Sequence, residues 1–114
     1  MLSSALKTFL DDLKDAKLDD RVLVLAFSEF GRRVEENDSQ GTDHGTAGPV
    51  LLAGPAVKPG LHGKTPSLTD LSGGDLKSSI DFRDVYATVL GKWLDLRAPE
   101  SLTSFKELSI LRST

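Results

Sequence analysis

Apolar residues near the N-terminus recur at the spacing of a helix. From Leu6 to Leu13 they occupy positions i, i+3, i+4 and i+7, and Asp and Lys fill most of the positions between them. This pattern predicts an amphipathic helix that ends near Lys17, with Ser3 and Ser4 as suitable N-caps.

A second helical pattern runs from Phe82 to Leu94, with apolar residues at i, i+3, i+4, i+7, i+8, i+11 and i+12. Asp81 is placed to cap its first turn. Phe82 and Trp93 lie on the apolar stripe, so we expect both in the core. The scattered apolar residues of the tail, 101–114, are expected to lie over a neighbouring surface.

Two short apolar runs predict strands. "RVLVLAF" at 21–27 has no alternation, which is typical of a strand buried on both faces in a parallel sheet. "PVLLAG" at 49–54 predicts the second strand. Residues 31–48 are rich in glycine and charge and predict a long loop. The prolines and glycines of 54–66 predict an irregular segment.

Length and composition fit one small unit. The 114 residues are 39% hydrophobic and 27% charged, as in a globular domain with a modest core. Strands buried on both faces need more helices than this pattern offers. We therefore expect residues 1–114 to form a single partial α/β domain, a piece of something larger.

Charge and cysteine content narrow the partners. The formal net charge is -3, and the 14 Lys and Arg are spread along the chain, so no nucleic-acid partner is expected. The absence of cysteine leaves only oxygen and imidazole as metal ligands. The longest apolar run, 22–27, is far shorter than the roughly 20 residues of a membrane span. The N-terminus also lacks the basic segment followed by an apolar segment that is typical of a signal peptide.

The stretch "GTDHGTAGP" at 41–49 places Asp43 and His44 side by side between glycines. Carboxylate oxygen and imidazole nitrogen are ligands of divalent cations such as Zn²⁺ and Mn²⁺. Adjacent residues of an extended chain point in opposite directions, so the pair can serve two ions or place only one side chain in a site. The alternative is a turn with solvated polar residues.

Glu29 and Arg32, in "SEFGRR", directly follow the first predicted strand. Open α/β sheets bind ligands at the carboxyl ends of their strands, which favours a functional role for both. The alternative is a Glu29–Arg32 surface pair, worth at most about 1 kcal/mol. The second histidine, His62, has no carboxylate nearby in the sequence and is expected to lie exposed in a loop.

Three segments, "VLVLAFSEFGRRVEEN", "GTDHGTAGPVLLAGPAVKPGLHG" and "DFRDVYATVLGKWLDL", together resemble the C-terminal part of the bacterial family named domain of unknown function 1501. The resemblance runs from about Arg21 to Leu111. Members are longer, often carry a twin-arginine export signal and are placed in the alkaline phosphatase and sulfatase superfamily. The resemblance implies a partial alkaline phosphatase-like three-layer α/β fold. It also implies that the missing N-terminal part of the same domain is the partner of this segment, and that the protein is exported or periplasmic.

In that superfamily, metal ligands commonly come as "DHG" after one strand and "HG" shortly before a later one. One alignment puts Glu29 at that aspartate, Phe30 at the first histidine and His44 at the last metal-binding histidine. Another lays Asp43 and His44 directly on the "DH" pair. Under the first alignment the site loses one imidazole, because Phe30 cannot coordinate a cation.

The resemblance therefore implies a segment of a metal-dependent phosphate or sulfate ester hydrolase relative that is inactive alone. His44, Asp43 and Glu29 would hold a divalent cation, Zn, Mn, Mg or Ca, and Arg32 would bind the anionic group of a small ester substrate. The alternative is a non-catalytic exported binding or surface protein that keeps the fold without the chemistry, and Phe30 favours it.

Overall fold

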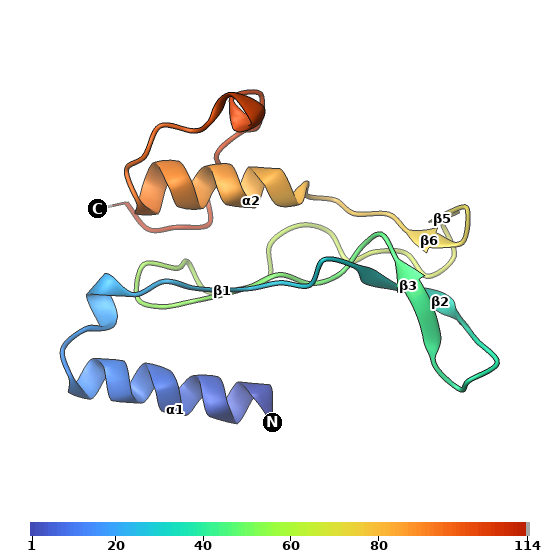
Figure 1. The fold of residues 1–114 in the computed structure, drawn as a ribbon, viewed down its shortest axis with the longest axis horizontal. Coiled ribbons are helices and arrows are strands. Elements are labelled where there is room, and N and C mark those ends of the chain that lie inside the picture. Colours follow the sequence, from blue (N-terminus) through green and yellow to red (C-terminus); the bar gives the residue numbers. More distant parts are fainter. Residues whose placement is uncertain (114) are drawn as a thin grey trace.

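The computed structural model describes residues 1–113 of the chain and shows a mixed α/β structure with extents of 48 × 36 × 21 Å. Two α-helices accompany six short strands, which pair as three separate two-stranded antiparallel sheets (Figure 1). The helices are α1 (Leu2–Asp15) and α2 (Phe82–Thr88), and the strands are β1 (Val24–Ala26), β2 (Gly31–Glu36), β3 (Thr42–Gly45), β4 (Leu51–Ala53), β5 (Leu71–Ser72) and β6 (Asp75–Leu76). Two 3-10 turns, η1 (Asp19–Arg21) and η3 (Glu100–Leu102), and a π-helical turn, η2 (Val89–Trp93), complete the elements.

Helix α1 confirms the first predicted helix, which ends at Asp15 rather than near Lys17. The predicted caps Ser3 and Ser4 are wrong, because the helix begins two to three residues earlier. Its N-cap is Met1, and the Ser4 hydroxyl donates to the Met1 carbonyl at 2.9 Å. No residue of α1 is buried, and Leu6, Leu10 and Leu13 of its apolar stripe are only half-buried.

Helix α2 confirms the second predicted helix and its cap. The Asp81 carboxylate accepts a hydrogen bond from the Arg83 backbone N–H at 2.9 Å. The helical path continues past Thr88 as the π-helical turn η2. Trp93 packs against the core as expected, whereas Phe82 is 56% exposed, so the prediction of a core position for Phe82 is wrong.

Strands β1 and β4 confirm the two predicted strands but not their environment. They pair antiparallel, with Leu25 opposite Leu52, and none of the six residues is buried. The prediction of a strand buried on both faces in a parallel sheet is therefore wrong for residues 1–113. An unbroken apolar run indicates burial but carries no information about strand direction, and here the chain between the two strands simply reverses.

That reversal overturns the predicted loop at 31–48. Strands β2 and β3 form an antiparallel hairpin in which Gly31 faces Gly45 and Arg32 faces His44, with a register shift before Glu36. At its turn, the side-chain oxygen of Asn37 accepts backbone N–H bonds at 3.0 Å from two residues. The hairpin is polar on both faces, so it lacks the hydrophobic alternation that marks a half-buried strand.

The core is small and lies between α2, the β1/β4 ribbon and the tail. Val85 of α2 contacts Ile110 and Leu111, each less than 10% exposed, which confirms the expectation that the tail covers a neighbouring surface. Residues 54–66 are irregular as predicted, and Val57 makes an isolated bridge to Leu111. Partly buried hydrophobic residues complete the cluster: Leu23, Leu25, Leu52, Val57, Ile80, Trp93 and Leu108.

A three-layer fold is not evident in the part of the chain that the structure describes. Helix α2 lies on one side of the ribbon and α1 on the other (Figure 1), but α1 buries no residue against it. The sheets are only two strands wide. The α/β class is therefore established, and the layered arrangement stays a prediction.

Thr88 ties the tail to α2. It is 0% exposed, its hydroxyl donates to the Asp84 carbonyl at 2.6 Å, and it accepts the Leu108 N–H at 2.8 Å. The buried Asp84 carboxylate accepts the Lys106 N–H at 3.1 Å. Two buried side chains thus satisfy backbone groups of the tail, which would otherwise be left unpaired.

We expect Thr88→Val to lower the free energy of unfolding by about 1–3 kcal/mol, because the Leu108 N–H loses its acceptor without any change in side-chain shape. Urea denaturation measures the loss. Thr103→Val is the matched control, since the exposed Thr103 hydroxyl only donates to a carbonyl three residues earlier, and its effect should stay within about 0.5 kcal/mol. Equal effects of the two variants would contradict the prediction.

Asp81 should contribute to acid stability. Side-chain hydrogen bonds from the Arg83 guanidinium, of 2.9 and 2.7 Å, together with the Arg83 backbone N–H, lower the pKa of Asp81 from 3.8 to about 2. A lowered pKa in the folded state stabilises the protein above the unfolded value, and this contribution is lost as the pH falls from about 4 towards about 2.

Asp81→Asn keeps a capping side chain but removes the ionisation. Thermal unfolding followed between pH 2 and 5 should show a shallower decline of the melting temperature for this variant than for the wild type. Asp38→Asn, at an exposed turn position, removes the same charge and should keep the wild-type slope. Parallel curves for all three proteins would overturn the assignment.

Candidate functional site

Close backbone approach fixes the base of the β2/β3 hairpin. A Cβ atom added to Gly31 would lie 1.6 Å from the Ala47 carbonyl oxygen, and one added to Gly45 would lie 2.9 Å from the Arg32 carbonyl carbon. Only glycine leaves this space. Gly31 and Gly45 face each other next to the pair formed by Arg32 and His44, so their small size lets the two strands approach closely beside that pair.

Three candidate side chains meet at this base. The rings of Phe30 and His44 stack with centroids 3.5 Å apart and an interplanar angle of 12°. The Arg32 guanidinium carbon lies 5.5 Å from the Phe30 centroid, and Arg32 donates to the Thr42 carbonyl at 2.7 Å. We call Phe30, Arg32 and His44 the hairpin-base cluster. Arg32 and His44 are exposed, and Phe30 is half-buried.

Asp43 does not join this cluster. Its carboxylate accepts a hydrogen bond from the Asn37 side-chain amide at 3.1 Å, at the turn end of the hairpin. Neighbouring residues of a strand point to opposite faces, which agrees with His44 and Asp43 having different partners. The sequence placed the two residues side by side, but the structure gives them separate surroundings.

Glu29 is exposed and directly precedes Phe30. The surface pair between Glu29 and Arg32, considered as the alternative to a functional role, is not among the ion pairs formed within residues 1–113. His62 lies exposed in its loop as expected, with Nε2 3.1 Å from the Lys58 carbonyl oxygen.

Within residues 1–113, no three His, Cys, Asp or Glu side chains converge in a way that could hold a metal ion. The hairpin-base cluster offers one imidazole and one guanidinium on an aromatic ring. His44 could supply a single metal ligand, and Arg32 presents positive charge that suits an anion. The predicted metal role of His44, Asp43 and Glu29 therefore stays a prediction.

Two residues that hold the hairpin were not singled out from the sequence. Arg33 pairs with Asp75 at 3.1 Å and so attaches the hairpin to the β5/β6 sheet. Asn37 forms the turn, and the run "ENDSQG" carried that signal, because Asn and Asp accept bonds from backbone N–H groups two residues ahead. The Arg33–Asp75 pair spans 42 residues and leaves no local signal.

We expect Gly31→Ala to lower the free energy of unfolding by about 3 kcal/mol or more, because the added methyl group meets backbone rather than a mobile side chain. Urea denaturation provides the measurement. Gly41→Ala is the control, since its nearest neighbour would be the Asn37 side-chain oxygen at 3.7 Å. A Gly31→Ala protein as stable as Gly41→Ala would show that the base of the hairpin is not constrained.

Comparison with known proteins gives a family but no function. The family model described as "Protein of unknown function (DUF1501)" matches residues 1–99, so the match starts earlier and ends earlier than the resemblance seen from about Arg21 to Leu111. No curated protein and no solved structure matches the chain. None of the helices in residues 1–113 is long and apolar enough to cross a membrane. With nearly its whole length matched, the chain belongs to the DUF1501 family.

Proposed function

We propose that the chain forms part of a metal-dependent phosphate or sulfate ester hydrolase domain, in which His44 binds a divalent cation and Arg32 binds the anionic group. The observation that carries this proposal is the contact between the rings of Phe30 and His44, 3.5 Å apart. It bears directly on how the chain aligns with the alkaline phosphatase and sulfatase superfamily.

In that superfamily one ligand pair follows a strand and another ligand precedes a later strand. Here Glu29 and Phe30 follow β1, and His44 precedes β4. The contact between residues 30 and 44 is compatible with two neighbouring ligand positions. This supports the alignment that places His44 at the last metal-binding histidine, with Phe30 replacing its partner.

The neighbourhood of His44 suits this role. Among residues 1–113 its ring nitrogens make no hydrogen bond, while the stacked Phe30 ring restricts its orientation. Imidazole is a preferred ligand of Zn²⁺ and Mn²⁺ rather than of Mg²⁺ or Ca²⁺, so we favour the first two. Glu29, beside Phe30, and Asp43, beside His44, are the carboxylates nearest in sequence that could complete the ligand set.

Arg32 faces His44 across the hairpin and would act on the substrate. One of its guanidinium nitrogens donates to the Thr42 carbonyl, which anchors the side chain. The planar guanidinium can donate two parallel hydrogen bonds to oxygens of a phosphate or sulfate group and so orient the ester. A bound divalent cation would polarise a phosphoryl or sulfuryl oxygen of that ester.

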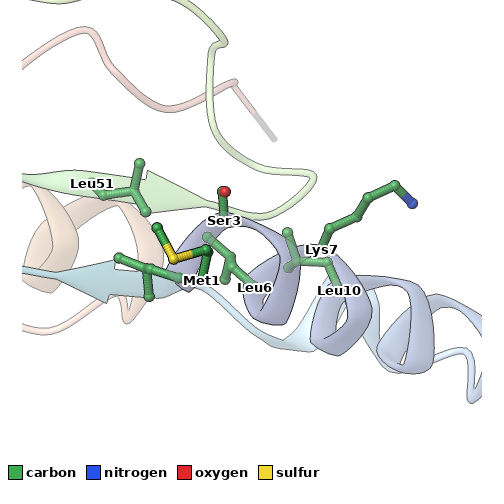
Figure 2. Close-up of a pocket in the computed structure, with 7 residues that line it drawn as sticks. Met1, Ser3, Leu6, Lys7, Leu10 and Leu51 are labelled. Atoms are coloured by element: carbon green, nitrogen blue, oxygen red, sulfur yellow. The ribbon is translucent and has the colours of Figure 1, made fainter.

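Further parts of the same domain would complete the site and a three-layer fold. The apolar stripe of α1 is only partly covered, with Leu2 71% and Phe9 46% exposed. Leu6 and Leu10 of α1 and Leu51 of β4 line an open hollow of about 530 Å³ (Figure 2). Apolar surface of this kind is normally covered in a complete domain. An exported location, suggested by the resemblance, belongs to the same proposal.

One observation favours a second function, a non-catalytic binding or surface protein. Phe30, which one of the two alignments puts at a metal-ligand position, cannot coordinate a cation, and its ring stacks on His44 instead. Under this alternative Arg32 and His44 would bind an anion without hydrolysing it.

Titration of the protein, in its longest natural form, with Zn²⁺ and Mn²⁺ by calorimetry tests the proposal. We expect His44→Ala to weaken metal binding at least about tenfold, equal to about 1.4 kcal/mol, because a direct ligand is lost. His62→Ala removes the other histidine of the 114 residues and should leave binding unchanged. Arg32→Gln should weaken the binding of a phosphate or sulfate ester while metal affinity is kept.

Phe30→His provides a gain-of-function arm. The new imidazole would lie beside His44, so Zn²⁺ affinity should rise about tenfold, and the further change His44→Ala should abolish that gain. If no ion binds the wild-type protein, or if His44→Ala leaves binding unchanged, the hydrolase proposal fails and the non-catalytic alternative takes its place.

A further inference from the structure

The tail forms a second polar site at the other end of the molecule. In Figure 1 the segment that follows α2 and the β2/β3 hairpin lie towards opposite ends of the long axis. There, two backbone hydrogen bonds of 2.9 and 2.7 Å join residues 56–58 to residues 110–112, and their donors are the N–H groups of Lys58 and Arg112. The pairing fixes the positions of these two basic residues relative to each other.

Antiparallel pairing sets their spacing. Val57 pairs with Leu111, so Lys58 lies opposite Ile110, and Arg112 is two residues further along the same segment. Such diagonal neighbours have Cα atoms about 7–8 Å apart on one face. At this spacing two long cationic side chains can reach one tetrahedral anion placed between them.

Both residues line an open hollow of about 470 Å³. Lys58 Nζ donates to the Ser109 hydroxyl at 2.7 Å, and Arg112 Nε donates to the Val57 carbonyl at 3.3 Å. Neither cation pairs with a carboxylate among residues 1–113, and both side chains are held by neutral acceptors. The two terminal guanidinium nitrogens and the remaining ammonium hydrogens are left to bind a ligand.

The hollow is also lined by one ion pair, whose two charges cancel. Lys92 pairs with Glu107 at 3.1 Å, and both line the hollow. Lys92 belongs to the π-helical turn η2, a rare geometry that often occurs at functional sites. The Glu107 carboxylate packs where a Cβ on Gly91 would lie 1.9 Å from it. With this pair neutral, Lys58 and Arg112 give the hollow an excess of positive charge in a chain whose net charge is -3.

We propose that Lys58 and Arg112 form a binding site for a tetrahedral oxyanion, a phosphate or sulfate group. Arg112 donates from its terminal nitrogens and Lys58 supplies a compact charge, a combination typical of phosphate recognition. The Ser109 hydroxyl, which already contacts Lys58, holds that side chain in place. This site is separate from Arg32 and does not depend on the proposed function.

NMR titration of the ¹⁵N-labelled protein with inorganic phosphate tests the site at constant ionic strength, with chloride as the balancing anion. We expect saturable shifts of the amides at 56–58 and 108–113. Lys58→Gln and Arg112→Gln should each weaken binding about tenfold or more, since each removes charge-assisted hydrogen bonds. Lys58→Arg should restore most of the affinity.

Lys64→Gln is the charge-matched control, because Lys64 is exposed and lies six residues after Lys58. This variant should bind phosphate within about twofold of the wild type. A parallel titration with phenyl phosphate shows whether free phosphate or a phosphate monoester binds more tightly. Binding of either ligand at these residues supports the site. Shifts that do not saturate, that map elsewhere, or that weaken equally in the Lys64→Gln protein would overturn the proposal. If Arg112→Gln does not fold, the two Lys58 variants decide.

Discussion

The antiparallel pairing of β1 with β4 is the constraint on which the rest of the structure depends. The two strands run in opposite directions, so the chain leaving β1 must reverse before it enters β4, and residues 31–45 make that reversal as a hairpin. The same pairing presents Leu25 and Leu52 to Val85 of α2 and to the tail. Both the small core and the candidate site therefore follow from three paired residues on each strand.

The sequence predicted those elements whose hydrophobic pattern is local. Both helices and both apolar strands were predicted correctly. Each helix shows its apolar spacing, and each strand its unbroken apolar run, within a short stretch of sequence. The β2/β3 hairpin was missed because its strands are polar on both faces, and what holds them is backbone contact at Gly31 and the distant Arg33–Asp75 pair. Strand direction was also wrong, since an apolar run is the same in a parallel and an antiparallel pair.

Of the candidate site, the sequence predicted residue types but not their grouping. Asp43 and His44 were expected to be able to point in opposite directions, and they do have separate partners, Asn37 and Phe30. The stack joins Phe30, which directly precedes β2, to His44 of β3, and it requires the hairpin register, which no local pattern carries. Arg32 entered the prediction as a residue at the end of a strand, and the register adds that it faces His44.

Phe30 is the residue that separates the two proposed functions, a metal-dependent hydrolase and a non-catalytic binding protein. A phenyl ring cannot coordinate a cation, yet its near-parallel stack on His44, with ring centroids 3.5 Å apart, restricts the orientation of the imidazole. Under the proposed alignment, Phe30 therefore orients His44 at a position where the superfamily has a metal ligand. A single oriented imidazole can still bind a cation when other parts of the domain supply the remaining ligands, whereas the pair of Arg32 and His44 can bind an anion with no metal present. The same three side chains thus fit both functions, and the difference lies in whether carboxylates approach the free edge of the His44 ring.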